Sequence, residues 1–249
     1  MSSQRLRAAG LVWPMALALP ALAVLLALGT WQMQRRAWKE DLIAKITARV
    51  HQPPVPLADV EKRAADGLEY ARVRVSGTFR HEAEQLLWEP EPRHGPGYHV
   101  YTPLRLDDGR FILVNRGYVP EALKSPSARA PGQIAGEVHI VGLLREPPAR
   151  AMFDPGRDAK TGVWYWRDLD GMARAALGDA AGKAVRLFLD AEAAPANPGG
   201  WPQGGTTRLT LPNRHLEYAL TWYGLAVTLI AVLAAFIASR LRTRPNPPG

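Results

Sequence analysis

Two long runs without charge constrain the fold of this chain more than any other feature. No charged residue occurs from position 8 to 34 or from 218 to 239. A helix needs about 20 predominantly apolar residues to cross a bilayer, and both runs reach that length. Aromatic residues, which favour the membrane interface, lie near the run ends: Trp31, Tyr218, Trp222 and Tyr223. The sequence therefore predicts two transmembrane helices, 11–33 and 215–239.

The first run also resembles a signal peptide. Ala21-Leu22-Ala23 has the small-x-small pattern of a cleavage site. However, the apolar run continues through Leu28, and the basic region before it is short. We therefore favour an uncleaved membrane anchor, in which Pro14 and Pro20 are tolerated as kinks.

The distribution of arginine predicts the orientation of the two spans. Two spans place the tails 1–10 and 240–249 on one side of the membrane, and both tails are rich in arginine. Cytoplasmic segments carry an excess of Lys and Arg, so we expect both termini in the cytoplasm. Arg35, Arg36 and Lys39 oppose this orientation, but long domains translocate largely regardless of charge. The segment 34–214 is then expected in the periplasm of a bacterial inner membrane, or its equivalent.

The overall charge does not indicate nucleic-acid binding. The formal charge is +8, but five basic residues lie in the tails, which contain no acidic residue. The remaining 26 basic residues are nearly balanced by 23 acidic ones. No basic stripe with interleaved aromatic residues is present, so no nucleic-acid partner is expected. The absence of cysteine excludes disulfides, thiol catalysis, covalent haem attachment and Cys-based metal sites.

The segment between the spans begins with a predicted helix and continues as short strands. Apolar residues at four-residue spacing predict an amphipathic helix over 36–50, which Pro53 and Pro54 end. Residues 68–80 alternate apolar and polar side chains, which predicts a strand with one wet face. Further strands are predicted at Gln85–Glu89, Tyr98–Leu106, Arg110–Val119, Glu137–Arg145, Gly162–Arg167 and Ala184–Glu192.

Turn and helix-cap residues indicate how the predicted strands and helices of the domain are connected. Asp107-Asp108-Gly109 joins two strands as a hairpin, and Asp168 caps a short helix that ends at Leu177. Residues 193–207 are rich in Pro and Gly and indicate a loop. We predict a mixed, mainly antiparallel β domain with short helices, barrel-like or an open sheet, between the two transmembrane helices.

No common catalytic motif is present, so no catalytic residue is predicted. The sequence lacks GxSxG, HExxH and P-loop patterns, which argues against a membrane-tethered hydrolase. His94 and His99 flank the Gly95-Pro96-Gly97 turn and can bind a metal. Surface histidines of a hairpin are the favoured interpretation, with His99 on the polar face of its strand. His51, His81 and His139 are assigned no role.

His215 opens the second span and is the main candidate ligand. Asn213 is a plausible N-cap, and Glu217 suits the positive end of the helix dipole. Helical spacing places Tyr218, Trp222 and Leu225 on the face of His215. A helix N-terminus disfavours added positive charge, and neutral imidazole is the form that binds iron. From its position alone, His215 can be either a metal ligand or an ordinary histidine at the membrane interface.

The end of the first span carries a cluster of aromatic and basic residues that could lie near His215. Trp31, Arg35 and Trp38 share a helix face, with Gln32 and Arg36 beside it. Arg35 or Arg36 can bind a carboxylate. Each of these two arginines can instead extend its side chain to the membrane–water interface, or pair with Glu217.

Four segments resemble the surfeit-locus-one family of cytochrome c oxidase assembly proteins. LGTWQMQRRAWKEDLI at 28–43 resembles the family's first signature, and VSGTF at 75–79 its next block. ILVNRGYVP at 112–120 resembles its most recognisable block. NRHLEYALTWYGLA at 213–226 resembles its closing block, with Arg214 where the family has a second Asn. Residues 122–207 match less clearly.

The resemblance implies a non-enzymatic factor for assembly of cytochrome c oxidase. Bacterial members are similar to carriers that pass haem a to the catalytic subunit, so His215 is implied as the axial iron ligand. The other residues of the implied haem site are Trp31, Arg35, Arg36, Tyr218 and Trp222. The implied partners are the oxidase catalytic subunit, haem a synthase and the bilayer.

The alternative within the family is a haem-free scaffold that docks oxidase subunits or haem a synthase. Trp38, Asn115, Arg116 and Gly117 would then be structural or form a docking surface.

Overall fold

The computed structural model describes residues 11–62, 67–92, 94–150, 155–209 and 211–242. Contacts divide the chain into a helical unit, 1–45 with 210–249, and a β-rich domain, Ile46–Leu209.

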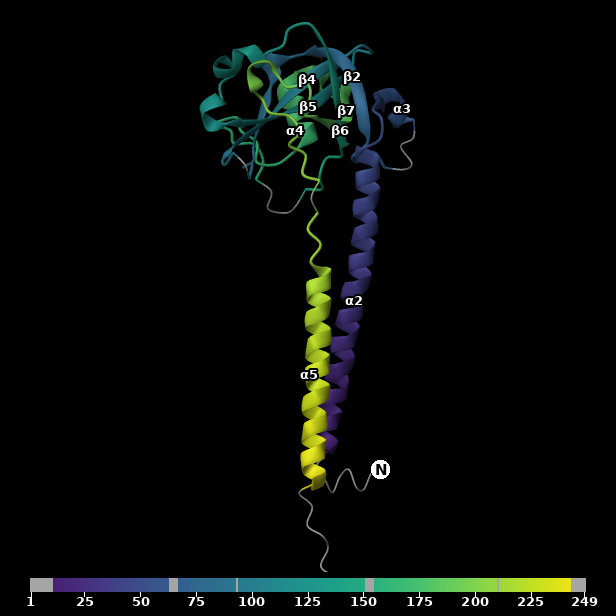
Figure 1. The fold of residues 1–249 in the computed structure, drawn as a ribbon. Coiled ribbons are helices and arrows are strands. Elements are labelled where there is room, and N and C mark those ends of the chain that lie inside the picture. Colours follow the sequence, from purple (N-terminus) through teal and green to yellow (C-terminus); the bar gives the residue numbers. More distant parts are fainter. Residues whose placement is uncertain (1–10, 63–66, 93, 151–154, 210, 243–249) are drawn as a thin grey trace, which may run out of the picture. The chain divides into compact units, whose positions relative to one another are not determined.

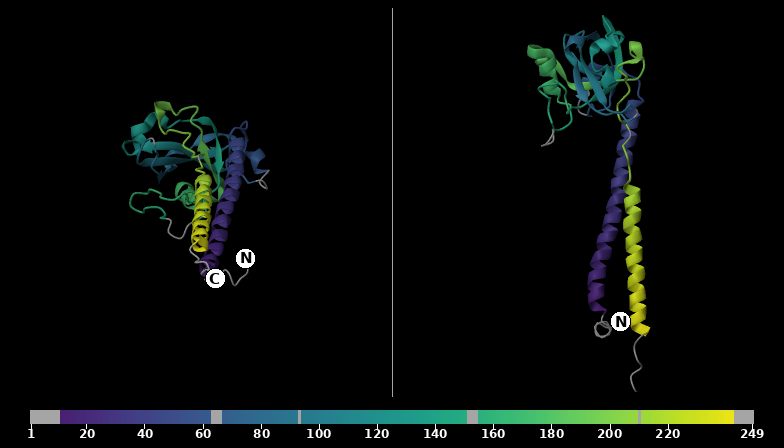
Figure 2. Two further views of the ribbon diagram at one scale, coloured as in Figure 1. Left: turned by 60° about the horizontal axis from the view of Figure 1, so that its bottom comes forward. Right: turned by 90° about the vertical axis from the view of Figure 1, so that its left-hand side faces the viewer.

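The helical unit is built on two long helices, α2 (Val12–Val50) and α5 (His215–Arg242). Both are long and apolar enough to span a bilayer, and only 6% of the most apolar window of each is buried. Their exposed surface carries large apolar side chains such as Trp13, Leu17 and Leu220, which suits contact with lipid. Figures 1 and 2 show the helices side by side and antiparallel, with the start of α2 and the end of α5 together. The last residues of α2 cover the predicted amphipathic segment without a break.

Small residues allow α2 and α5 to approach closely. Gly29 of α2 is buried, as are Ala219 and Ala226 of α5. A Cβ atom at Gly29 would lie 2.6 Å from Cε1 of Tyr223. The Tyr223 hydroxyl lies 3.2 Å from Oγ1 of Thr30. Small residues at the contact and a polar pair across it are the usual means of helix association in membranes.

Gly29→Ala is therefore expected to lower the thermal midpoint of the full chain in detergent. Overpacking of this kind costs about 1–3 kcal/mol. Adding Tyr223→Ala removes the ring and is expected to recover part of the loss. Gly224→Ala is the matched control, because no atom lies within 4 Å of the position of its Cβ. Equal midpoints for Gly29→Ala and Gly224→Ala would contradict the close approach.

The described part of the domain contains seven strands in the sheet order β1-β2-β6-β7-β5-β4-β3. The strands are β1 (Val55–Pro56), β2 (Arg72–Phe79), β3 (Gln85–Trp88), β4 (Gly97–Leu106), β5 (Phe111–Pro120), β6 (Glu137–Arg145) and β7 (Ala184–Ala191). The α-helices are α3 (Leu57–Glu61) and α4 (Leu169–Leu177). The 3₁₀ helices are η2 (His81–Ala83), η3 (Glu121–Leu123), η4 (Pro126–Gly132), η5 (Gly178–Lys183) and η6 (Pro198–Gly200).

Strand β2 closes the sheet into a barrel, because it pairs with both β6 and β4. The ring β2-β6-β7-β5-β4 is antiparallel except for the parallel pair β5–β7. The barrel encloses one apolar core, which includes Val73, Leu104, Ile112 and Leu189. Helix α4 packs a second core against the outer face, through Leu169 and Met172. Strands β4 and β5 are therefore buried on both faces.

The structure confirms the predicted fold class and most predicted elements. Alternate residues of β2 from Val73 to Phe79 are buried, as its alternation predicts. The Asp107–Gly109 turn joins β4 to β5, and the Asp168 carboxylate accepts a hydrogen bond from the backbone N–H of Gly171.

Two predictions for the domain need correction. The predicted strand 68–80 begins only at Arg72, since Tyr70 adopts a left-handed φ of 62°. The predicted strand Gly162–Arg167 is wrong. Only Trp164 forms isolated bridges there, to Leu87 and Arg157, while its side chain fills the outer core.

Candidate functional site

His215 meets Gln32 where α5 begins. The Nδ1 atom of His215 lies 2.7 Å from Oε1 of Gln32, and the histidine is half-buried. Because an amide oxygen only accepts, the Nδ1–H group donates and the neutral ring keeps its lone pair on Nε2. Within the described residues, Nε2 has no hydrogen-bond partner. A metal-binding histidine usually has its other ring N–H held in this way.

The predicted cap of α5 is shifted by one residue. The helix begins at His215, so Arg214 occupies the capping position, and the backbone N–H of Tyr218 donates to its carbonyl oxygen. The Asn213 side chain is close, with Oδ1 3.5 Å from the backbone N of His215.

The residues predicted to share a helix face with His215 all lie on α5 and differ in exposure. The side of α5 that faces α2 carries His215, Ala219 and Ala226. Trp222 is half-buried, but Tyr218 and Leu225 are exposed. On the unbroken helix α5 the four positions fall within an arc of about 80°, so they share one side of the helix, and Tyr218 and Leu225 are its exposed members.

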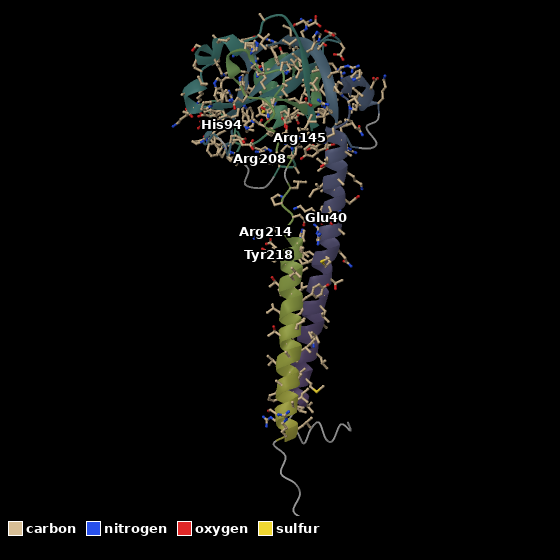
Figure 3. All side chains as sticks on the ribbon, in the orientation of Figure 1. Glu40, His94, Arg145, Arg208, Arg214 and Tyr218 are labelled. Atoms are coloured by element: carbon tan, nitrogen blue, oxygen red, sulfur yellow. The ribbon has the colours of Figure 1, made fainter. Side chains whose placement is uncertain are left out.

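The arginines of α2 do not contact His215. Arg36 pairs with Glu40 at 2.7 Å, and the Arg35 guanidinium lies 4.4 Å from the centre of the Trp38 ring. The pairing of Arg35 or Arg36 with Glu217 is not formed, because Arg214 binds Glu217 at 3.0 Å. Figure 3 shows Arg214 and Tyr218 at the start of α5, beside the part of α2 that carries Glu40.

Trp31 and Trp38 lie on the exposed side of α2. Both are about half exposed, on the face that carries Arg35. Gly29 and Gln32, which contact α5, lie on another face. Trp31, Arg35 and Trp38 thus lie on a different face of α2 from Gln32, whereas Arg36 follows Gln32 by one helical turn.

Residues 115–117 are structural within the domain. Asn115 and Arg116 are both buried. Gly117 has a φ of +115°, and a Cβ there would lie 1.7 Å from the carbonyl oxygen of Gln203. Only glycine suits this position, where the chain bridges Tyr118 to Gln203.

Arg116 ties three loops to the barrel. Its guanidinium donates to the carbonyl oxygen of Gly132, to Oδ1 of Asn197 at 2.9 Å and to Nδ1 of His81 at 3.4 Å. It also lies 4.8 Å from the centre of the Phe79 ring. Burial, with the nearby positive charge of Arg129, lowers the pKa of Arg116 to about 10. Arg116 remains charged at neutral pH and is held by neutral acceptors.

His99 lies inside the domain rather than on a polar surface. It is 4% exposed, because the segments around Trp166 and Thr207 cover the outer face of β4. The prediction that His99 lies on the solvent-exposed face of its strand is therefore wrong. His94 is exposed and stacks on Tyr118 with 5.5 Å between ring centres. Among the described residues, no group of three potential ligands could hold a metal ion.

The remaining histidines have ordinary partners. Nδ1 of His51 lies 2.7 Å from the Thr47 carbonyl oxygen, and Nδ1 of His139 lies 2.7 Å from the Ser76 hydroxyl. Nε2 of His81 lies 2.9 Å from the Ile134 carbonyl oxygen. Gln32 is the residue whose role the sequence did not reveal. Its three-residue spacing from the buried Gly29 is the signal that places it on the contact face.

Comparison with known proteins identifies relatives along most of the chain. The model of the SURF1 family matches residues 19–227. Surfeit locus protein 1 of Homo sapiens is 41% identical over 215 residues, covering 80% of this chain and 69% of that protein. The Rattus norvegicus protein of the same name is 40% identical over 219 residues, covering 82% and 69%. That of Takifugu rubripes is 38% identical over 232 residues, covering 86% and 93%.

Proposed function

The chain belongs to the SURF1 family and has a role in cytochrome c oxidase assembly, and from that premise we propose that it carries haem a transiently on His215. Haem a is the cargo, and the chain's own part is to bind, orient and release it. We assign no catalytic step to the chain.

One observation carries this proposal. His215 is half-buried between two helices, its Nδ1–H is engaged by Gln32, and its Nε2 has no partner among the described residues. This donor fits haem iron, which takes an imidazole nitrogen as an axial ligand. A single histidine leaves the opposite side of the iron open, which suits a carrier that must release its cargo.

The surroundings of His215 suit an amphipathic cargo. Trp222 and Tyr218 supply aromatic surface at the start of α5, and the exposed apolar surface of the helix pair can accept a hydrocarbon tail. Arg36 is half-exposed and Arg35 exposed, so either can turn to a propionate. We place these groups at the outer interface, with the β domain in the periplasm or its equivalent and both termini in the cytoplasm. The partners we propose are the oxidase catalytic subunit and haem a synthase.

Gln32→Leu is expected to weaken haem a retention about tenfold. The change removes the acceptor of the Nδ1–H group, and loss of such a partner typically costs a metal site 10- to 100-fold. The measurement is the ratio of haem a to protein after purification in mild detergent. Gln34→Leu is the matched control, since Gln34 is an exposed residue of the same helix. Equal haem a content in both variants would exclude a role for Gln32.

Complementation separates the carrier from a scaffold. In cells that lack their own copy of this protein, the wild-type chain is expected to restore haem a to the oxidase catalytic subunit. The His215→Ala chain, present at the same level in the membrane, is expected not to restore it. Full restoration by His215→Ala would favour a haem-free scaffold.

A further inference from the structure

A row of polar side chains crosses the outer face of the barrel. Register pairs Tyr101 of β4 with Asn115 of β5, and Asn115 with Asp190 of β7. Asp190 accepts hydrogen bonds from Arg145 of β6 at 3.1 Å and from the Thr207 hydroxyl at 3.0 Å. These side chains form the floor of a cavity of about 570 Å³. Burying polar groups costs free energy unless they are hydrogen-bonded, so this row of buried polar side chains points to a role beyond packing.

Asn115 fixes the proton of the neutral His99 ring. The backbone N–H of Gly117 donates to Oδ1 of Asn115 at 3.1 Å, while Nδ2 donates to Asp190 at 3.1 Å. The amide orientation is thereby set, and its second N–H faces Nδ1 of His99 at 3.3 Å. Nδ1 must accept, so the neutral ring carries its proton on Nε2. This buried N–H has no acceptor within the described chain.

The cavity also contains a cation that has no acidic partner among the described residues. Arg145 is paired with Glu69 and Asp190, and Arg208 lies 3.8 Å from Glu89. Arg167 lines the cavity and forms no ion pair with a carboxylate of the described residues. Its neighbour Tyr101 does not neutralise it, because burial raises the pKa of that hydroxyl above its ordinary value. Figure 3 shows Arg145 and Arg208 at the same edge of the domain.

Aromatic side chains form the wall above the polar floor. Trp88 is 42% exposed and lies 6.1 Å from Tyr165, measured between ring centres, and Trp166 lines the same cavity. Ligand sites are typically concave and largely apolar, with a few polar groups that fix orientation. The volume is within the usual range of about 300–1,000 Å³ for small-molecule sites.

We propose that this cavity binds a small carboxylate with a flat aromatic body. The carboxylate would accept from the His99 Nε2–H group and pair with Arg167, while the body stacks against Trp88 and Tyr165. The site lies within the β domain, is formed by residues other than those of the proposed haem site, and stands whether or not His215 binds haem.

The test compares 2-naphthoate with the neutral 2-naphthamide, using saturation-transfer difference NMR on the full chain in detergent. Saturable binding of naphthoate is expected, with naphthamide at least about tenfold weaker, the effect of losing one charge-assisted hydrogen bond. Arg167→Gln is expected to weaken naphthoate binding by at least about tenfold as well. The matched control is Arg105→Gln, because Arg105 is an exposed residue of β4 outside the cavity.

His99 is tested by a conservative pair of variants. His99→Gln keeps an N–H donor and is expected to retain naphthoate binding, whereas His99→Leu is expected to lose it. Tryptophan fluorescence checks folding, and where His99→Leu does not fold, Arg167→Gln decides alone. Equal binding of naphthoate and naphthamide, or unchanged naphthoate binding by Arg167→Gln, would overturn the proposal.

Discussion

His215→Ala is expected to remove haem a from the purified protein, lowering the ratio of haem a to protein by at least about tenfold. Loss of the imidazole removes the proposed iron ligand, while the contact of Gly29 with Tyr223 still holds the helix pair. The variant should therefore insert into the membrane and purify at the wild-type level. A pyridine haemochrome assay on protein from a host that makes haem a gives the ratio.

His94→Ala is the matched control for this prediction. His94 is an exposed histidine of the β domain and lies in a separate unit of the chain. It is expected to keep the wild-type haem a content. Full haem a content in His215→Ala would contradict the ligand assignment, and loss in both variants would point to a general defect rather than to His215.

Arg116→Met is expected to destabilise the β domain by about 3 kcal/mol or more. The change leaves the Gly132 carbonyl oxygen and the Asn197 amide oxygen without their charged donor inside the domain. Hydrogen bonds to charged groups contribute about 1.5–3 kcal/mol each, and buried acceptors left unpaired add to the loss. Because domains are stable by only about 5–15 kcal/mol, the effect should be evident in urea unfolding followed by tryptophan fluorescence.

Arg105→Met provides the comparison. Arg105 lies on β4 and is exposed, so its loss is expected to change the free energy of unfolding by less than about 0.5 kcal/mol. The two variants change the same functional group to the same side chain. Similar stabilities for both would mean that the hydrogen bonds of Arg116 do not hold the loops at Gly132 and Asn197.

Regular patterning made much of the fold predictable. The alternation of apolar and polar residues from Val73 to Phe79 predicts one buried strand face, and the two uncharged runs predict the two long helices. Closure of the barrel was not predictable to the same degree. It depends on three residue pairs between β2 and β4, which are far apart in sequence and leave no local signal. The strand predicted at Gly162–Arg167 does not form either. Its residue Trp164 packs instead in the outer core beside α4, a tertiary contact that strand patterning does not predict.

The sequence singles out His215 as a candidate ligand but does not reveal its contact with Gln32. His215 stands out because it opens an apolar helix, whereas Gln32 lies 183 positions away and looks like one of several polar residues after a span. The pairing of Arg214 with Glu217 was likewise not predicted. Arg214 lies only three residues before Glu217 on the same helix end, whereas the predicted partners Arg35 and Arg36 lie on α2. The burial of His99 was not predictable from strand alternation, because two segments distant in sequence cover its strand.

An optical spectrum of the full chain decides whether His215 holds haem a. The protein would be purified in mild detergent from a host that makes haem a, and a pyridine haemochrome assay would identify any pigment. The wild-type protein is expected to show a haem a spectrum that is absent from His215→Ala. A colourless wild-type protein that still co-purifies with oxidase subunits would contradict this expectation and leave His215 as an interfacial residue paired with Gln32.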